Sequence, residues 1–188
     1  PIARAQARPM PEDSRSSPPH RLARLAAAVY SAYAMLVFGV VIFLVTCPLI
    51  LMLPGLGLRR AVGRGGVHLA MLLIGVPLRV SGREHLPQEA CVVVANHASY
   101  IDGILLTAVL PSRFSFVVQD GAARWPYIGR VLRRMGVIFI NRTSPREGSL
   151  QTRQLIRRLQ QGQSLTIFPE GTFVRAPGLL PFKNGAFL

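Results

Sequence analysis

The chain has 188 residues, enough for one ordinary domain with a short appendage. Half of the residues are hydrophobic and the mean hydropathy is +0.35, which is high for a soluble domain of this size. A net charge of +14 predicts an anionic partner: a nucleic acid, an anionic lipid surface or a phosphorylated substrate. The two cysteines, Cys47 and Cys91, lie far apart without a CxxC pair, which excludes a cysteine zinc cluster and argues against a disulfide-rich secreted domain.

The first 58 residues divide into a polar tail and an apolar segment. Residues 1–24 are rich in Pro, Arg and Ser without an apolar period, so we expect a disordered basic tail. Residues 25–58 contain no charge and exceed the roughly 20 residues that cross a bilayer, which predicts a membrane anchor rather than a cleavable signal peptide. Pro48 and Pro54 leave two forms open: one spanning helix that ends near Pro48, or a kinked hairpin within one leaflet. Arginines flank both ends, so orientation stays open.

Beyond the anchor the pattern changes twice. Residues 59–76 combine a glycine-rich hinge with a short apolar helix from Val67 to Ile74. After Pro77, short apolar runs alternate with helical patterns, which predicts an α/β domain over 77–188 with a mostly parallel or mixed sheet flanked by helices. The expected strands are 78–81, 91–95, 114–118, 137–140 and 165–168, and the expected helices are 100–110, 126–135 and 145–161. The last helix has Ser144 as N-cap, Pro145 at its first position, Glu147 closing a capping box and Gly162 as its stop.

Three of these strands end in polar residues. The strand at 91–95 ends in Asn96-His97, and Asp102 follows five residues after the histidine. If His97 lies in the turn before the helix, Asp102 can fix its tautomer and leave the other ring nitrogen as a general base. The alternative is that Ser99 and Asp102 form a capping box that serves only the helix end.

The other two strands supply an anion clamp and a polar turn. The run Gly-Val-Ile-Phe-Ile-Asn ends in Arg142, which can bind a phosphate bidentately or can be a solvated arginine at a strand end. The run Leu-Thr-Ile-Phe-Pro ends in Glu170-Gly171-Thr172, where the carboxylate is placed to bind substrate hydroxyls or an amine. Lys183, the only lysine, returns near the same edge.

In this order and spacing, the three motifs and the later run Leu-Leu-Pro-Phe-Lys-Asn-Gly-Ala-Phe resemble the lysophosphatidate (1-acylglycerol-3-phosphate) acyltransferase family of the glycerophosphate acyltransferase superfamily. The resemblance covers about residues 75–188. It implies that His97, oriented by Asp102, deprotonates a glycerol hydroxyl that attacks the thioester of acyl-CoA or acyl carrier protein. It also implies that Asn96, Arg142, the Glu170 turn, Arg175 and Lys183 bind substrate, with no metal and no cofactor beyond the acyl donor.

The sequence departs from the family pattern on the acceptor side. Phe173 stands where the family has an arginine, and Arg175 is the candidate to replace it. Gln119 and Gly121 occupy positions where the family often has Lys and Glu. These differences keep another lysophospholipid or lyso-ornithine lipid open as the acceptor.

The resemblance and the apolar segment together predict an enzyme on the cytoplasmic side of a bacterial inner membrane, in contact with an anionic lipid surface. A catalytically silent lipid-binding protein is the second hypothesis. A serine hydrolase lacks its GxSxG motif, and nucleic-acid binding leaves the apolar segment unexplained. We also expect a fragment, because the chain starts at Pro1 rather than Met and stops at Leu188, just after an apparent helix start.

Overall fold

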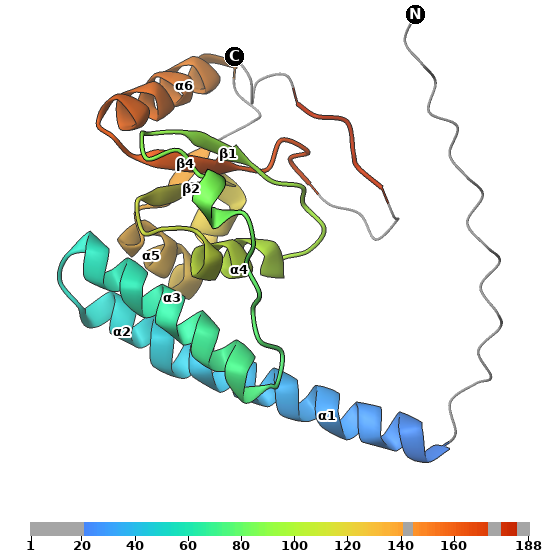
Figure 1. Ribbon diagram of the computed structural model, residues 1–188. Helices are drawn as coiled ribbons and strands as arrows, with labels where there is room; N and C mark the ends of the chain where they lie inside the picture. The colour runs from blue at the N-terminus through green and yellow to red at the C-terminus, as the bar shows by residue number, and fades with distance from the viewer. Residues whose placement is uncertain (1–20, 141–144, 173–177, 184–188) are drawn as a thin grey trace, which may run out of the picture.

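The computed structural model describes residues 21–140, 145–172 and 178–183. They form an α/β layer carrying the C-terminal half and a helical hairpin from the N-terminal half (Figure 1). Helix α6 covers one face of the sheet, helices α4 and α5 cover the other, and the hairpin packs beneath α4 and α5. This layering leaves the hairpin far from α6 and beside the two helices that follow the first strands.

The sheet has four described strands in the order β1-β4-β2-β3, and every pair is parallel. The strands are β1 (Val92–Val94), β2 (Phe114–Gln119), β3 (Ile138–Ile140) and β4 (Ser164–Ile167). The helices that connect them are α4 (Ile101–Val109), α5 (Pro126–Arg134) and α6 (Pro145–Gln160). Parallel neighbours need such crossover helices, so the alternation in the sequence correctly predicts the fold class.

Most element predictions agree with the structure, within a few residues at each end. The helix that begins at Pro145 ends at Gln160, and Gly162 follows it with a φ of 81°, as expected for a glycine stop. Ser144 lies outside the described residues, as does the side chain of Glu147. The predicted strand at 78–81 is wrong, since this segment has no regular structure. Its alternating pattern lies in an exposed connection, and a strand needs a neighbour to accept its backbone bonds.

The N-terminal hairpin begins with one long helix. Helix α1 (Arg21–Gly39), the π-helical turn η1 (Val40–Thr46) and α2 (Cys47–Met52) follow one another without a break. Within η1 the Cys47 N–H bonds the carbonyl of Ile42, five residues back, directly before Pro48. Because proline lacks an N–H and its ring crowds the preceding turn, a wider turn lets the helix continue. Of the two forms that the sequence left open, the helix that ends near Pro48 is therefore wrong, since the helix continues to Met52.

The return arm of the hairpin is α3 (Leu56–Leu73), which follows a turn at Gly55 with a φ of 73°. The glycines at 63, 65 and 66 lie inside this helix, so the predicted hinge over 59–66 is wrong. One physical reason is close packing: a Cβ at Gly66 would overlap the Thr46 side chain on the facing arm. At this position glycine allows the two arms of the hairpin to approach each other closely, and it does not interrupt α3.

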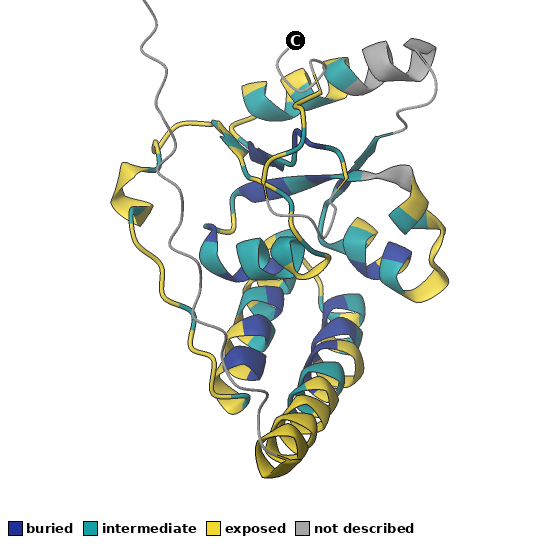
Figure 2. Cartoon of the chain, turned by 90° about the vertical axis from the view of Figure 1, so that its right-hand side faces the viewer, coloured by how far each residue is buried: buried dark blue, intermediate teal, exposed yellow. Residues whose placement is uncertain are grey.

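The hairpin and the α/β layer share one apolar core, in which Val41, Ile50 and Ala70 pack together with Ala108 and Val131. Arg60 of α3 is 8% exposed and donates to the carbonyls of Met135 at 3.0 Å and Ser112 at 2.7 Å, and to the Ser115 hydroxyl. Met135 ends α5, where the helix dipole favours a cation. The first half of α1 is exposed instead (Figure 2).

Candidate active site

The site lies where β1 and β4 end. These strands pair in parallel, with Val94 opposite Ile167, and the Ala95 N–H extends the pairing to the Ile167 carbonyl at 3.1 Å. Parallel strands present their carboxyl ends at the same edge, where open α/β sheets place their ligands. The two motifs that follow β1 and β4, 73 residues apart, are thereby brought together: His97 and Glu170.

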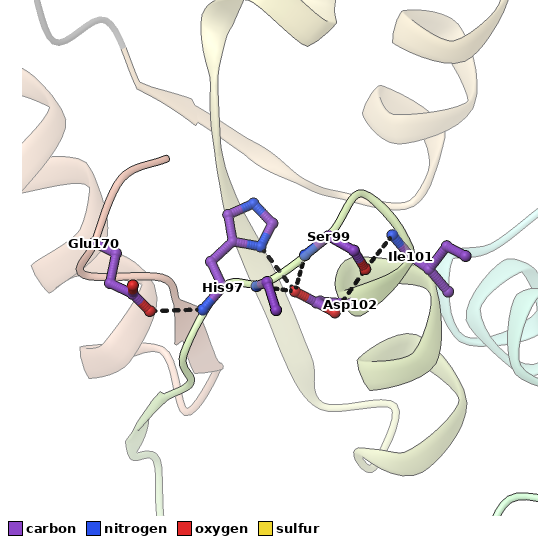
Figure 3. A network of polar contacts seen from close by, with 6 residues as sticks. His97, Ser99, Ile101, Asp102 and Glu170 are labelled. Carbon is purple, nitrogen blue, oxygen red and sulfur yellow. Dashed lines mark hydrogen bonds and ion pairs between the residues drawn. The ribbon is translucent and has the colours of Figure 1, made fainter. Parts of the chain in front are cut away.

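His97 and Asp102 form the pair that the spacing predicts (Figure 3). His97 Nδ1 lies 3.0 Å from Asp102 Oδ2, and the two side chains are 20% and 22% exposed. His97 is in the loop before α4, and Asp102 is in the first turn of that helix. This loop geometry lets residues five apart in sequence meet.

Asp102 also binds the loop that carries the histidine. Its Oδ2 accepts the N–H groups of Ala98 at 2.7 Å and Ser99 at 2.8 Å, and its Oδ1 accepts the Ser99 hydroxyl at 3.0 Å. Ser99 in turn accepts the Ile101 N–H at 3.2 Å. The sequence posed histidine orientation and helix-end binding as alternatives, and one carboxylate performs both.

The electrostatics of Asp102 favour its charged form. Burial raises the pKa of this carboxyl, but the hydrogen bonds from Ser99, Ala98 and His97 outweigh it and hold the pKa below its ordinary value. Asp102 is therefore ionised at neutral pH and accepts the proton on His97 Nδ1. The Nε2 atom is then the ring nitrogen that can act as a base.

The end of β4 holds His97 from the other side. The Phe168 ring stacks on the imidazole with centroids 4.3 Å apart and planes 25° apart. Glu170 Oε1 accepts the His97 backbone N–H at 2.7 Å (Figure 3). Backbone N–H groups of Leu180 and His97 hold the pKa of Glu170 below its ordinary value, against a smaller effect of burial.

Of the other residues predicted to bind substrate, four lie at the same edge of the sheet as His97 and two lie outside the described residues. Asn96 and Thr172 are exposed beside His97 and Glu170, and Gly171 turns the chain with a φ of 74° that only glycine adopts readily. Lys183 is also exposed, and its backbone N–H bonds the Pro169 carbonyl at 2.8 Å, which confirms that the lysine returns to this edge. Arg142 and Arg175 lie outside the described residues.

A cavity of about 860 Å³ opens beside His97. Its wall is mainly apolar and comes from both arms of the hairpin, from α4 and α5, and from β2. Examples are Ile50, Ile104, Phe116 and Ile128, while His97, Tyr100, Phe168, Gly171 and Thr172 line it beside the end of β4 and the loop before α4. Sequence reasoning missed this cavity, since hydrophobic periodicity shows which helix faces are buried but does not distinguish a packed core from a hollow one.

Chemically, the arrangement is a general base beside an apolar cavity. In the described part of the chain, no three His, Cys, Asp or Glu side chains gather as metal ligands. A histidine held by a carboxylate can take a proton from a hydroxyl as that oxygen attacks an electrophile.

Comparison with known proteins agrees with this chemistry. A family model described as Acyltransferase matches residues 77–188. A 1-acyl-sn-glycerol-3-phosphate acyltransferase of Neisseria gonorrhoeae is 37% identical over 129 residues, covering 69% of this chain and 49% of the relative. A lyso-ornithine lipid O-acyltransferase of Rhodobacter capsulatus is 38% identical over 120 residues, covering 64% of this chain and 42% of the relative. The chain thus spans about half the length of these curated relatives.

The fold has a counterpart among solved structures. The crystal structure of the 1-acyl-sn-glycerophosphate acyltransferase PlsC from Thermotoga maritima matches with a TM-score of 0.58 at 21% identity, over 89% of this chain and 69% of that one. The chain belongs to the acyltransferase family, in the group that includes the 1-acyl-sn-glycerol-3-phosphate acyltransferases.

Proposed function

We propose that the protein is a membrane-bound O-acyltransferase. It moves a fatty acyl group from acyl-CoA or acyl carrier protein to the free hydroxyl of 1-acylglycerol-3-phosphate and so forms phosphatidate. The observation that carries this proposal is the His97–Asp102 pair, 3.0 Å apart, with His97 lining a mainly apolar cavity. The relatives named as acyltransferases support the reaction class.

In the proposed reaction, His97 Nε2 accepts the proton of the acceptor hydroxyl while that oxygen attacks the thioester carbonyl carbon. The tetrahedral intermediate collapses, the C–S bond breaks, and the proton held by His97 passes to the departing thiolate. Asp102 stabilises the imidazolium in between. General base catalysis of this kind contributes about 10²–10⁴-fold, and the positioning of two bound substrates contributes more.

The apolar cavity fits an acyl chain of either substrate. Each methylene that leaves water contributes about 0.8 kcal/mol, so a long chain draws much of its binding free energy from such a wall. The carbonyl to be attacked would then lie near His97, which lines the cavity. Arg142 and Arg175 are the proposed ligands of the acceptor phosphate, with Thr172 and Lys183 near the same edge.

The membrane is the proposed location because the acceptor is a lipid and the hairpin is apolar. Arg21–Met52 is the one described helix long and apolar enough to cross a bilayer. Its first half is exposed, and Leu22, Met35 and Leu36 are each more than two-thirds exposed. We propose that this surface is buried in lipid, with the active site and the anionic lipid surface on the cytoplasmic side. Co-sedimentation of the purified protein with anionic vesicles at high salt tests this association.

The acceptor head group has a second candidate. The relative of Rhodobacter capsulatus is named for lyso-ornithine lipid, and Phe173 and Gln119 depart from the phosphate-acceptor pattern. A panel of acceptors distinguishes the candidates: labelled acyl-CoA and acyl carrier protein are offered with lysophosphatidate, other lysophospholipids and lyso-ornithine lipid. We expect phosphatidate as the main product. A different lipid product would identify another lysolipid as the acceptor. No transfer to any acceptor would favour the silent lipid-binding hypothesis.

A further inference from the structure

Among the acidic residues whose side chains the structure describes, Glu170 is the one that is buried, with 3% of its surface exposed. It follows β4 directly after Phe168 and Pro169. A buried carboxylate is costly unless hydrogen bonds or a counterion replace its water. In the described part of the chain, no lysine or arginine forms an ion pair with it.

Two backbone N–H groups satisfy this carboxylate instead. Oε1 accepts from His97 at 2.7 Å, and Oε2 accepts from Leu180 at 2.8 Å. These donors come from separate segments, one being the loop after β1 and the other the segment at 178–183. A second bond, from the Lys183 N–H to the Pro169 carbonyl, fixes the same segment to the end of β4. One side chain therefore joins three pieces of chain around the site (Figure 3 shows the His97 side).

We propose that Glu170 is a positioning residue for the acyl transfer and not a ligand of the substrate. Its carboxylate fixes the backbone of His97, while Asp102 and Phe168 fix the ring. This differs from the sequence-based expectation that Glu170 binds substrate hydroxyls or an amine. Both oxygens already accept a short hydrogen bond, and burial leaves little of the side chain for a substrate to contact. The inference rests on the proposed acyl transfer, since that reaction needs the base in one place.

The test compares two variants with opposite defects. Glu170→Gln keeps the side-chain length but turns an amide N–H toward one of the backbone donors. Glu170→Asp keeps the charge but is one methylene too short to reach both donors. We expect each variant to lower kcat about 10²-fold, the cost of a small misplacement of a catalytic group. KM and the directly measured Kd for the lysolipid acceptor should stay within about twofold of wild type, because under this proposal Glu170 makes no contact with the bound acceptor.

Exposed Glu89 offers a matched control, since Glu89→Gln makes the same chemical change ahead of β1 and should alter neither constant. A Glu170→Gln protein that raises the acceptor Kd about tenfold with kcat unchanged would overturn the proposal in favour of substrate binding. Unchanged kinetics in both Glu170 variants would overturn it as well.

Hydrogen exchange separates this inference from the proposed function. In Glu170→Gln, the amides at 95–102 and at 178–183 should both exchange faster, while those at 153–160 in α6 keep their wild-type rates. Uniformly faster exchange would indicate general destabilisation and contradict a local role. If wild-type protein transfers no acyl group to any lysolipid, the proposed function fails, yet this exchange experiment still tests whether Glu170 joins the two segments.

Discussion

His97 is held by groups that come from two elements of the fold. Asp102 of α4 accepts from its Nδ1, and Phe168 and Glu170, after β4, contact its ring and its backbone. Each of these contacts removes a degree of freedom that a free histidine would have to lose during catalysis. Pre-organisation of this kind lowers a barrier because the ordering is done during folding.

Asp102→Asn tests the orienting role of the carboxylate. The amide keeps one acceptor oxygen but presents N–H groups to a site that holds three N–H donors and one hydroxyl. We expect kcat to fall about 10²–10⁴-fold with little change in acceptor KM. Ser99→Ala is the comparison, since it removes the hydroxyl's bonds with Asp102 Oδ1 and the Ile101 N–H but leaves the His97–Asp102 contact, and its kcat should fall by less than about tenfold. Equal losses in steady-state assays of the two variants would refute a special role for the Asp102–His97 contact.

The depressed pKa values of Asp102 and Glu170 make stability depend on pH in one direction. The unfolded chain binds these protons with pKa values of about 3.9 and 4.3, above the folded values. Their contribution to stability is therefore full above about pH 5 and is lost as the pH falls through the folded pKa values. Denaturant unfolding in detergent from pH 6 to pH 3 should show this decline. The decline should be shallower in Asp102→Asn, and parallel curves would disprove the linkage.

At the scale of single residues, the sequence predicted the contact between His97 and Asp102 but not the partners of Glu170. The contact could be predicted because the two residues are five apart, one in the loop before α4 and the other in its first turn, where spacing restricts the geometry. The bonds of Glu170 depend on backbone groups 73 and 10 residues away, which only the strand order brings near. No local pattern encodes such contacts.

Among the secondary-structure elements, the contact between α3 and the first helix of the hairpin is testable through two neighbouring glycines. A Cβ at Gly66 would come within 2.6 Å of Thr46 Cγ2 and overlap its hydroxyl, whereas nothing lies within 4 Å of one at Gly65. We expect Gly66→Ala to lower the free energy of unfolding by about 1–3 kcal/mol through overpacking. Gly65→Ala should raise it by about 0.5–1 kcal/mol through helix propensity. Thermal unfolding in detergent measures both, and effects of the same sign would show that the two arms do not touch there.

The same glycines explain which elements could be predicted. The strands at 91–95, 114–118, 137–140 and 165–168 are short runs rich in apolar and β-branched residues, a composition typical of parallel strands, so the sequence marks them directly, although Val92 and Val94 of the first are exposed. Gly63, Gly65 and Gly66 carry the composition of a hinge but lie inside α3, and at Gly63 and Gly66 a Cβ would come too close to Met135 and Thr46. Likewise Pro48 indicates a helix end, and the π-helical turn before it overrides that tendency. A tertiary contact decides the glycine case, and a local change of helix type decides the Pro48 case.

The whole molecule joins an apolar hairpin to a catalytic layer through a shared core and through the buried Arg60. The cavity beside His97 takes its wall from both parts. The sequence indicated each part separately: a long uncharged segment and an α/β domain with polar strand ends. How the two pack could not be derived, because side chains distant in sequence form that interface.

The most direct test of the account is acyl transfer by the full-length protein in membranes, wild type beside His97→Ala at matched expression. Labelled acyl-CoA and lysophosphatidate are supplied, and phosphatidate is measured. The account predicts phosphatidate from wild type and a loss of about 10²–10⁴-fold in the variant, with membrane association unchanged. Near-normal turnover by His97→Ala would contradict it, because the proposed reaction passes the hydroxyl proton through His97.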